Sequence, residues 1–391
     1  MITYEEALEI VKAKIRLLGT EKTEMMKSLN RVLRQDVFSD MNMPPFDKSA
    51  MDGYTCRRED IANELEVVET IQAGYLPKFE IGKNQCAKIM TGAAIPKGAD
   101  CVIIVEEVDE LSGNRIKYRK EKTSVNICYK AEDVVVGQKL LEAGTRITEK
   151  EIASLALTGC VEPIVSIKPR VGIITTGDEI VEPENIPIES QIRNTNAYQL
   201  LAQCENFGCE TKYYGIVKDT KVEIAASIVK AKQECDLILL TGGVSMGEYD
   251  LVPAILKKTG FELLFEKVAV QPGKPTVFGK CENTFVFGMP GNPVSSFIVF
   301  EFFVKEFLAG LMGLKSYSKT LPLEMGFDFR RKRNERLARI PVKINADGKL
   351  DAIEYHGSAH ISAFAFADGI ISIPIGVSEI KKGTIVSVRQ I

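Results

Sequence analysis

Residues 170–179 read RVGIITTGDE, an apolar run that ends in a glycine followed by two acids. Two later segments are also apolar runs that lead into glycines, DLILLTGG at 236–243 and TFVFGMPGNP at 284–293. The chain between them has helical spacing of apolar residues, as in KVEIAASIVKAKQ at 221–233. Short apolar strands that alternate with helices predict a parallel sheet with both faces covered. We therefore expect a Rossmann-like α/β domain in this part of the chain.

The remaining chain predicts parts of a different character. Residues 3–18 have helical spacing, and Thr3 with Glu6 forms a capping-box pattern. From 65 to 141, short apolar runs alternate with Gly and Pro, which predicts a β-rich module. The same pattern returns between 321 and 391 and predicts a small β-domain there. We therefore expect an α/β multi-domain protein.

The composition excludes several classes of protein. The 391 residues carry a formal net charge of -3, which lacks the basic excess of a general nucleic-acid binder. The first residues form no signal-peptide pattern. The most apolar stretch, 294–312, contains Glu301, Lys305 and Glu306, which are costly in lipid, so it reads as a buried helix. We expect a soluble, cytoplasmic protein without membrane or nucleic-acid partners.

The cysteines and histidines provide few candidates for catalysis or metal binding. Nine cysteines are scattered without a C-x-x-C pair, which indicates reduced core thiols rather than disulfides or a zinc site. His356 and His360 are the two histidines, spaced four residues apart. That spacing could suit a metal, but a zinc site needs three or four protein ligands and the sequence offers no evident partner for the two histidines. Oxygen chemistry from Asp, Glu, Ser and Thr has many more candidates.

Polar residues follow the three apolar strands. T-G-D-E begins at Thr176, T-G-G-V-S-M-G-E-Y-D spans Thr241 to Asp250, and M-P-G-N-P-V-S-S ends at Ser296. Ligands of open α/β sheets bind beyond the carboxyl ends of the strands. Each segment alone also fits a tight turn with a helix cap. Three such segments in one sheet favour a binding site.

The residue types at these strand ends favour an anion site with a metal. Carboxylates such as Glu179 and Asp250 suit Mg²⁺, which prefers oxygen ligands. Backbone N–H groups at the start of the next helix, residues 294–296, suit phosphate. Lys274, in Q-P-G-K-P, is a cation on a proline-stiffened turn and suits an oxyanion.

Two further segments are less specific. PPFDKSAMDGY, residues 44–54, combines turn-forming residues with three apolar side chains, and its spacing alone assigns no chemistry. The alternative for this segment is a solvated linker, which its apolar residues disfavour. RRKRNER, residues 330–336, fits a solvated edge or the wall of a cleft for an anionic substrate, and less well a nucleic-acid patch.

Seven motifs occur in a characteristic order between residues 44 and 296. They are D-x-S-A-M-D-G-Y, T-G-A, T-G-D-E, N-T-N, G-G-V-S-x-G-E-x-D, P-G-K-P and G-x-P-G-N-P-V-S-S. The series resembles the MoeA family of molybdopterin molybdenumtransferases and the E domain of gephyrin. Each motif alone is modest, whereas seven in order are specific, and the general layout covers essentially the whole chain.

The resemblance implies a four-part subunit that forms a homodimer with the active cleft shared between subunits. The implied parts are a connecting domain at 1–40 and 135–166, a β-rich insertion domain at 41–134, a molybdopterin-binding α/β domain at 167–315 and a C-terminal β-barrel domain at 316–391. The implied reaction combines adenylylated molybdopterin with molybdate, requires Mg²⁺, and yields molybdenum cofactor and AMP. Tungstate is a similar dianion and fits equally well. The molybdopterin adenylyltransferase is an implied partner protein.

The resemblance also implies roles for individual residues. The implied catalytic set is Asp52, Thr91, Asp133, Glu179, Asp219 and Asp250, with Glu179 and Asp250 as metal ligands. The implied substrate-binding set is Ser49, Thr176, Gly177, Asp178, Gly242, Gly243, Ser245, Lys274, Pro290, Gly291, Asn292, Pro293, Ser295, Arg333 and Ser358. Gln271 departs from the pattern, because some relatives carry a second lysine there, which puts an oxyanion contact at that position in doubt.

Two rival functions remain open at this point. The first is the molybdopterin adenylyltransferase itself, but such enzymes are roughly one domain long and do not account for the N-terminal and C-terminal parts. The second, of another class, is a gephyrin-like scaffold that binds peptides. Nothing in the sequence supplies the linker or the additional domain of such a scaffold, and the set of acidic residues favours catalysis.

Overall fold

The computed structural model describes residues 1–243, 251–315 and 320–391. The chain divides into two compact units. The first unit consists of Met1–Gln35, Ala143–Lys150 and Glu162–Ile391, and the second consists of Asp36–Glu142 and Glu151–Val161. Among the described residues, no helix has both the length and the apolar character needed to cross a bilayer. The four-part division implied by the resemblance stays a prediction.

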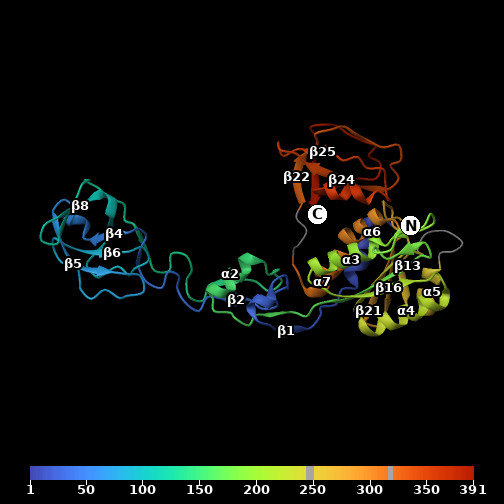
Figure 1. Cartoon of the computed structure of the whole chain (residues 1–391), viewed down its shortest axis with the longest axis horizontal. Helices are drawn as coiled ribbons and strands as arrows, with labels where there is room; N and C mark the ends of the chain where they lie inside the picture. Colours follow the sequence, from blue (N-terminus) through green and yellow to red (C-terminus); the bar gives the residue numbers. More distant parts are fainter. Residues whose placement is uncertain (244–250, 316–319) are drawn as a thin grey trace. The chain divides into compact units, whose positions relative to one another are not determined.

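Six described strands form the central sheet of the first unit (Figure 1). In spatial order they are β16 Glu210–Val217, β13 Arg170–Thr176, β17 Leu237–Thr241, β21 Thr284–Met289, β20 Val277–Cys281 and β18 Glu262–Phe265. The first four strands are parallel, as the alternation of strands and helices predicts. The prediction of an entirely parallel sheet is wrong, since β20 pairs antiparallel with both β21 and β18. Only Glu282 and Asn283 join β20 to β21, and two residues allow a hairpin but no crossover.

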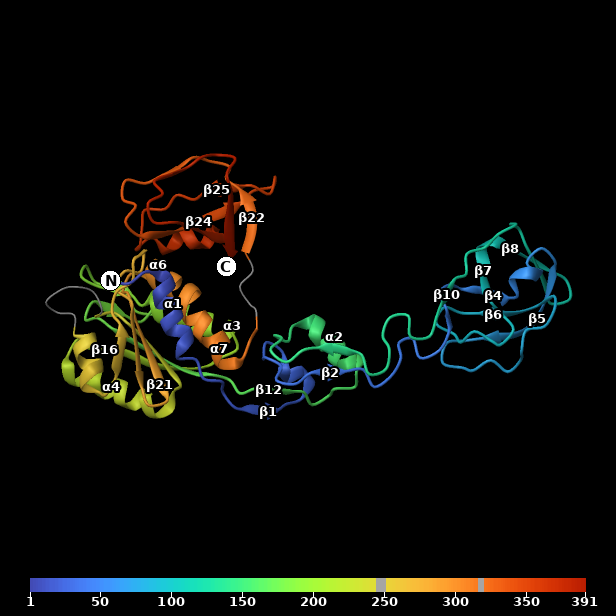
Figure 2. The same cartoon turned by 180° about the vertical axis from the view of Figure 1, so that it is seen from behind.

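Helices cover both faces of this sheet (Figure 2). One face packs against α4 Lys221–Glu234 and α5 Val252–Lys258, and the other packs against α1 Tyr4–Ala13, α3 Thr195–Asn206 and the helical segment at 293–312. Successive side chains of β17 point to opposite faces of the sheet and therefore join different hydrophobic cores. Leu237 and Leu239 lie in the core with α3, whereas Ile238 and Leu240 lie in the core with α4.

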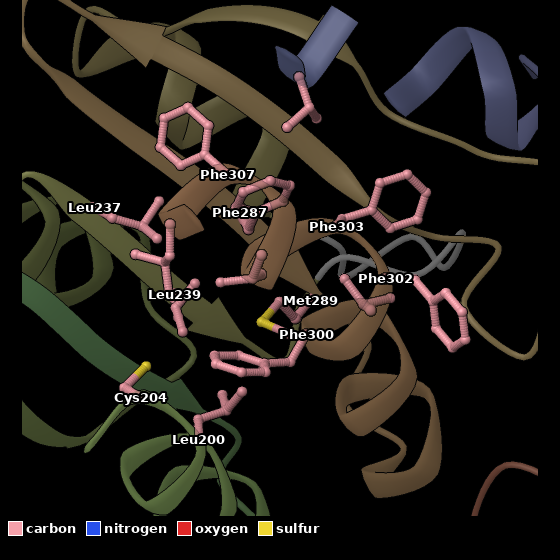
Figure 3. Close-up of a cluster of buried hydrophobic side chains, with 14 of the residues drawn as sticks. Leu200, Cys204, Leu237, Leu239, Phe287, Met289, Phe300, Phe302, Phe303 and Phe307 are labelled. Carbon is pink, nitrogen blue, oxygen red and sulfur yellow. The ribbon is translucent and has the colours of Figure 1, made fainter. Parts of the chain in front are cut away.

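The apolar stretch that was expected to be a buried helix is one continuous helical segment. It consists of α6 Pro293–Val299, the π-helical turn η4 Phe300–Val304 and α7 Lys305–Met312. Phe300 and Phe307 are fully buried, and Phe307 packs edge-on against Phe287 of β21 (Figure 3). Glu301 is buried as well, and its Oε2 pairs with the Lys305 ammonium at 2.7 Å. The paired charge explains how an acid is tolerated in this core.

The N-terminal helix begins as predicted and ends early. The Thr3 hydroxyl accepts a hydrogen bond from the Glu6 N–H, and the Glu6 carboxylate accepts one from the Thr3 N–H, which is a capping box. The helix, α1, ends at Ala13, so the prediction that it continues to residue 18 is wrong. Ile15 lies beyond the helix and is apolar because it packs on α7. The contact is so close that a Cβ added to Gly310 of α7 would lie 2.2 Å from the Ile15 Cδ1.

A second sheet of the first unit contains the C-terminal strands. Its order is β19 Val270–Gln271, β24 Leu337–Ile344, β26 Gly369–Ile373, β28 Ile385–Gln390 and β22 Thr320–Glu324, and β25 Leu350–Ala352 also pairs with β24. The apolar segment 261–270 contains two separate strands, since β18 pairs in the central sheet whereas β19 pairs with β24 in the second sheet. This pairing holds the Q-P-G-K-P turn beside the basic segment at 330–336.

The first unit also contains shorter elements. These are β1 Thr20–Lys22 paired with β12 Ile164–Ser166, β14 Ile180–Val181 paired with β15 Ile192–Arg193, β23 Phe329–Arg330 paired with β27 Glu379–Ile380, and the 3₁₀ turns η1 Met25–Ser28 and η5 Ile361–Phe366. The helix α2 Glu149–Leu157 connects residues of the two units.

The second unit is built on another six-stranded sheet. Its order is β7 Cys101–Ile104, β4 Gly53–Cys56, β6 Gln85–Ile89, β5 Glu64–Ile71, β9 Arg115–Tyr118 and β8 Val108–Leu111. Smaller pairs join β2 Val37–Phe38 to β11 Lys139–Leu141 and β3 Lys48–Ser49 to β10 Ile127–Cys128. Gly53 and Tyr54 were expected in a loop but begin the buried strand β4. A Cβ on Gly53 would lie 2.0 Å from the Ile103 carbonyl oxygen, so only glycine allows this close strand approach.

Candidate functional site

A cavity of about 670 Å³, here called the strand-end cavity, lies where β13, β17 and β21 end. The predicted residues that line it are Thr176, Gly177, Glu179, Asp219, Gly242, Gly243, Pro290, Gly291, Asn292 and Pro293. Asp178 lies beside the cavity, and its Oδ1 accepts a hydrogen bond from the Asp219 N–H at 3.3 Å. The structure thus brings together most of the residues that the sequence predicted for the α/β part.

Glycines let the backbone itself form the wall of the strand-end cavity. Gly242 follows β17 with a φ of 98°, and a Cβ at this position would lie 2.3 Å from the Thr176 carbonyl oxygen. Gly177 follows β13 with a φ of 147°. Residues with side chains rarely adopt these angles, so both positions require glycine. A ligand in the cavity can approach the main chain closely at these strand ends.

The carboxylates of the strand-end cavity repel one another. Burial raises the pKa of Asp219, and the negative charges of Asp178 and Glu179 raise it further, although the nearby Thr176 hydroxyl acts in the opposite direction. A cation bound beside Asp219 would stabilise its ionised form. The acids of this wall therefore suit a divalent metal ion or a ligand with hydrogen-bond donors.

Two asparagines of the N-T-N motif build this cavity, and the predicted site residues omitted both. Asn194 caps α3 by accepting a hydrogen bond from the Ala197 N–H at 3.1 Å. Asn196 donates through Nδ2 to Thr241 Oγ1 at 2.7 Å and to the Gly291 carbonyl at 2.8 Å. Asn196 therefore ties the end of β17 to the loop after β21. The position of N-T-N directly before a helix was the sequence signal that could have found them.

A second cavity of about 620 Å³, here called the basic cavity, adjoins the first. The cations that line it are Lys274, Arg331, Lys332, Arg333, Arg336 and Arg339. Within the described part of the chain, no carboxylate lines this cavity and none of the six cations forms an ion pair. Charges that lack a protein partner in one cavity indicate an anionic ligand. Lys274, Arg333, Ser295 and Ser358 were predicted here individually, and Arg331, Lys332 and Arg336 belong to the cluster at 330–336 for which a cleft wall was one of the alternatives.

Backbone carbonyls fix the orientation of two of these arginines. Arg331 donates to the carbonyl oxygens of Val377, Arg336 and Pro374 at 2.6 to 2.8 Å. Arg336 donates through Nη1 to the Val270 carbonyl at 3.3 Å, which joins the basic segment to β19. Carbonyls satisfy the donors without neutralising the charge, so the guanidinium groups remain available to an anion.

Arg339 is the most buried cation of this cavity. Its guanidinium lies 3.7 Å from the centroid of the Phe302 ring and 4.5 Å from that of Tyr4. Burial lowers its pKa to about 10, so the group stays charged at neutral pH. The ring faces hold this charge in place of a carboxylate. Arg339 therefore adds a positive charge to the wall without a counter-ion.

One hydrogen bond marks the boundary between the two cavities. Both cavities share Pro275, Pro290 and Asn292, and the Asn292 Nδ2 donates to Ser358 Oγ at 2.8 Å. The Val294 N–H donates to the Ser358 carbonyl at 3.1 Å. The prediction that the Val294 N–H at the start of α6 binds phosphate is therefore wrong, because this donor is already used.

The predicted residues of the second unit lie on a separate loop cluster. Asp52 Oδ1 accepts hydrogen bonds from the Thr91 N–H at 2.7 Å and the Thr91 hydroxyl at 3.1 Å. Ser49 is 1% exposed, and its hydroxyl donates to the Met51 carbonyl at 2.6 Å. The hydroxyl of Ser49 thus stabilises the loop, and its expected substrate contact stays a prediction. Asp133 is exposed, and its N–H donates to the Met43 carbonyl at 3.0 Å.

Two predicted residues, Ser245 and Asp250, lie outside the described residues, so the proposed pairing of Glu179 with Asp250 on a metal stays a prediction. Within residues 1–243, 251–315 and 320–391, no group of three or more His, Cys, Asp or Glu side chains could hold a metal ion. The described acids at the strand ends can therefore supply only part of a metal site.

Comparison with known proteins assigns the chain to a family. Residues 2–159 match the MoeA N-terminal region (domain I and II), residues 172–310 match a probable molybdopterin binding domain, and residues 322–391 match the MoeA C-terminal region (domain IV). The crystal structure of the molybdopterin biosynthesis moeA protein from Pyrococcus horikoshii OT3 is 32% identical, with a TM-score of 0.84 and 100% of both chains covered.

Two relatives carry an enzyme name. The molybdopterin molybdenumtransferase of Bacillus subtilis (strain 168) is 34% identical over 388 residues, which cover 95% of this chain and 90% of that protein. The enzyme of the same name from Haemophilus influenzae is 33% identical over 381 residues, covering 95% of this chain and 93% of its own length. With three matching regions and relatives that align almost end to end, the chain belongs to the molybdopterin molybdenumtransferase family of enzymes.

Proposed function

We propose that this enzyme inserts molybdate into adenylylated molybdopterin in the cytoplasm and releases AMP, with molybdenum cofactor as the other product. In this reaction the two dithiolene sulfurs of the pterin replace two oxygens of molybdate, which leave as water with protons from the thiols and the solvent. A water molecule cleaves the bond between the pterin phosphate and AMP, which leaves a phosphate monoester on the pterin and free AMP. The observation that carries the proposal is the pair of adjoining cavities. One is lined by six cations and no described carboxylate, and the other by glycine loops and acids.

The basic cavity suits the oxyanion. Molybdate is a tetrahedral dianion, and ammonium and guanidinium donors form charge-assisted hydrogen bonds with such groups. Lys274 comes from the turn after β19, and Arg333 and Arg336 come from the segment before β24, so cations from two parts of the chain meet around one volume. Gln271 also lines this cavity, but it is neutral and contributes a weaker contact. Tungstate has the same charge and shape and fits the same donors.

The strand-end cavity suits the adenylylated pterin. Gly242 and Gly291 expose main chain there, and the side chains of Thr176 and Asn196 supply polar groups at the wall. Burial, with a smaller contribution from the charges of Asp178 and Glu179, raises the pKa of Asp219, and a bound Mg²⁺ would favour its ionised form. Glu179 and Asp219 are the described residues that would hold the ion, and when bound it neutralises phosphate charge and polarises the bond to AMP.

The residues between the cavities set where the two substrates meet. Asn292 and Ser358, joined by their hydrogen bond, lie at the shared wall. A pterin in one cavity and an oxyanion in the other would approach each other at this wall. The chain's own part in the reaction is therefore to hold the oxyanion by charge, to hold the pterin by main-chain contacts and to align the two.

The direct test is AMP release. Purified protein is incubated with adenylylated molybdopterin and Mg²⁺, with molybdate, with tungstate or with no added oxyanion. We expect AMP release that depends on the oxyanion and on Mg²⁺ and needs no ATP. AMP release at the same rate without any oxyanion would contradict the proposal. Consumption of ATP would instead indicate the adenylyltransferase reaction, whose enzyme we expect as the supplier of the substrate.

We further propose that the protein is a homodimer in which each site combines Asp52 of one subunit with Lys274 of the other. Mixing Asp52→Asn and Lys274→Ala subunits tests this arrangement at a limiting molybdate concentration, where each variant alone releases little AMP. If sites are shared, mixed dimers regain one intact site, and the mixture should recover roughly a quarter of wild-type activity. No recovery after subunit exchange would show that both residues act within one subunit, and sedimentation as a 43.2 kDa species would exclude the dimer.

A further inference from the structure

The loop that carries Ser358 to the basic cavity also contains both histidines of the chain. Gly357 and Ser358 line the cavity, and Ser358 is held from the α6 side by Asn292 and by the Val294 N–H. The assigned functions do not use His356 or His360. Their rings are stacked, with centroids 4.9 Å apart and an interplanar angle of 8°. The two rings therefore lie at the base of the loop that presents Ser358.

His360 closes this loop with two hydrogen bonds. Its Nδ1 accepts from the His356 N–H at 3.3 Å, and its own N–H donates to the Gly357 carbonyl at 3.0 Å. Because Nδ1 is an acceptor here, the neutral ring must carry its proton on Nε2. A second proton on the ring would turn Nδ1 into a donor facing another donor. Protonation of His360 thus removes one of the two bonds that close the turn.

We propose that His360 is a positioning residue for the oxyanion site. Its neutral ring holds the turn at 356–360 and thereby holds Ser358 at the wall of the basic cavity, and protonation of the ring releases the turn and weakens oxyanion binding. This inference rests on the proposed placement of the oxyanion in that cavity. His360 acts through Ser358 and not by contact with substrate.

The charged and titratable groups around His360 decide which side chains can respond to a change in pH. The charged and titratable groups near it are Lys343 of β24, Glu354 and His356, and the His356 Nε2 lies 3.0 Å from Glu354 Oε1. The basic cavity itself is lined by lysines and arginines, which stay charged, and by Tyr355, whose pKa burial raises to about 12. Among the groups named here, the imidazoles of His356 and His360 are the ones that can take up a proton in mildly acidic buffer.

The test measures sulfate affinity by calorimetry in the full-length protein. Sulfate is the probe because it stays a dianion throughout the range, whereas molybdate gains protons in acid. From about pH 8 to about pH 5.5, we expect the wild-type Kd to rise about two- to tenfold, the range that corresponds to one hydrogen bond. His360→Asn keeps an acceptor near the position of Nδ1 but does not titrate. This variant should match the wild type at high pH and show no rise.

Two further variants complete the design. His360→Leu has no acceptor and should bind sulfate weakly at every pH, while His356→Asn keeps the backbone donor and should retain the rise. A wild-type Kd that does not change with pH, or a rise that persists in His360→Asn, would overturn the positioning role alone. Failure of sulfate to bind, or binding unaffected by Lys274→Ala, would overturn the oxyanion site itself and the role of His360 with it.

Discussion

Lys274→Ala is the sharpest test of where the oxyanion binds. Lys274 is half-buried on the turn after β19, lines the basic cavity and forms no described ion pair. One charge-assisted contact in a partly desolvated site contributes on the order of 1.5–3 kcal/mol. Its loss should therefore weaken molybdate binding roughly tenfold to a hundredfold. Five cations remain in the cavity, so binding is weakened and not abolished.

The assay is AMP release as a function of molybdate concentration. We expect the half-maximal concentration to rise by that factor, and excess molybdate to restore most of the rate. Because no described carboxylate loses a partner, the melting temperature should not fall. Lys280→Ala, on the neighbouring strand β20 and outside the cavity, is the matched control and should behave as wild type. If Lys274→Ala abolishes pterin binding and no molybdate concentration rescues it, Lys274 holds a substrate phosphate instead.

Four other variants test separate parts of the reasoning. Glu179→Gln should lower AMP release by orders of magnitude while the melting temperature stays near that of wild type, and unchanged activity at limiting Mg²⁺ would exclude Glu179 as a ligand. Asp52→Asn should likewise lower the rate without unfolding the second unit, as circular dichroism would show. The pKa of Asp219 is higher in the folded than in the unfolded state, so the folded protein holds this proton more tightly. As pH rises from the unfolded pKa to the folded pKa, the free energy of unfolding therefore falls. Asp219→Asn should therefore melt higher than wild type at neutral pH, with the gap closing in acid, and equal melting at neutral pH would contradict this. Phe302→Ala should cost about 3–5 kcal/mol of unfolding free energy in urea, since it empties a buried site beside two guanidinium groups.

Local pattern was enough to predict the parallel strands but not the complete sheets. β13, β17 and β21 are apolar runs that end in glycine or proline turns, and the structure confirms all three as neighbouring parallel strands. β19 has two residues and pairs with β24, which lies far along the chain. Such a short strand has no periodicity of its own, so only its distant partner identifies it.

The two cavities differ in how far the sequence revealed them. The strand-end cavity follows from a general rule for α/β sheets, so Thr176, Gly242 and Asn292 could be predicted before any geometry was known. The basic cavity depends on where β24 lies beside the Q-P-G-K-P turn. Lys274 could be predicted from its own turn. Arg331 and Arg336 are oriented by carbonyls of distant residues, so the sequence alone left open whether their cluster is a solvated edge or a cleft wall.

The N-terminal helix of the first unit packs on residues that are made very late. The Tyr4 ring lies 5.1 Å from that of Phe303, and its hydroxyl donates to the Phe302 carbonyl at 3.3 Å. On the ribosome, α1 emerges long before α7 exists, while every strand of the second unit's sheet lies between residues 53 and 118 and can pair early. Domains generally fold as they are synthesised. The second unit should therefore fold first. The apolar face of α1 should remain exposed, and accessible to chaperones, until translation is nearly complete.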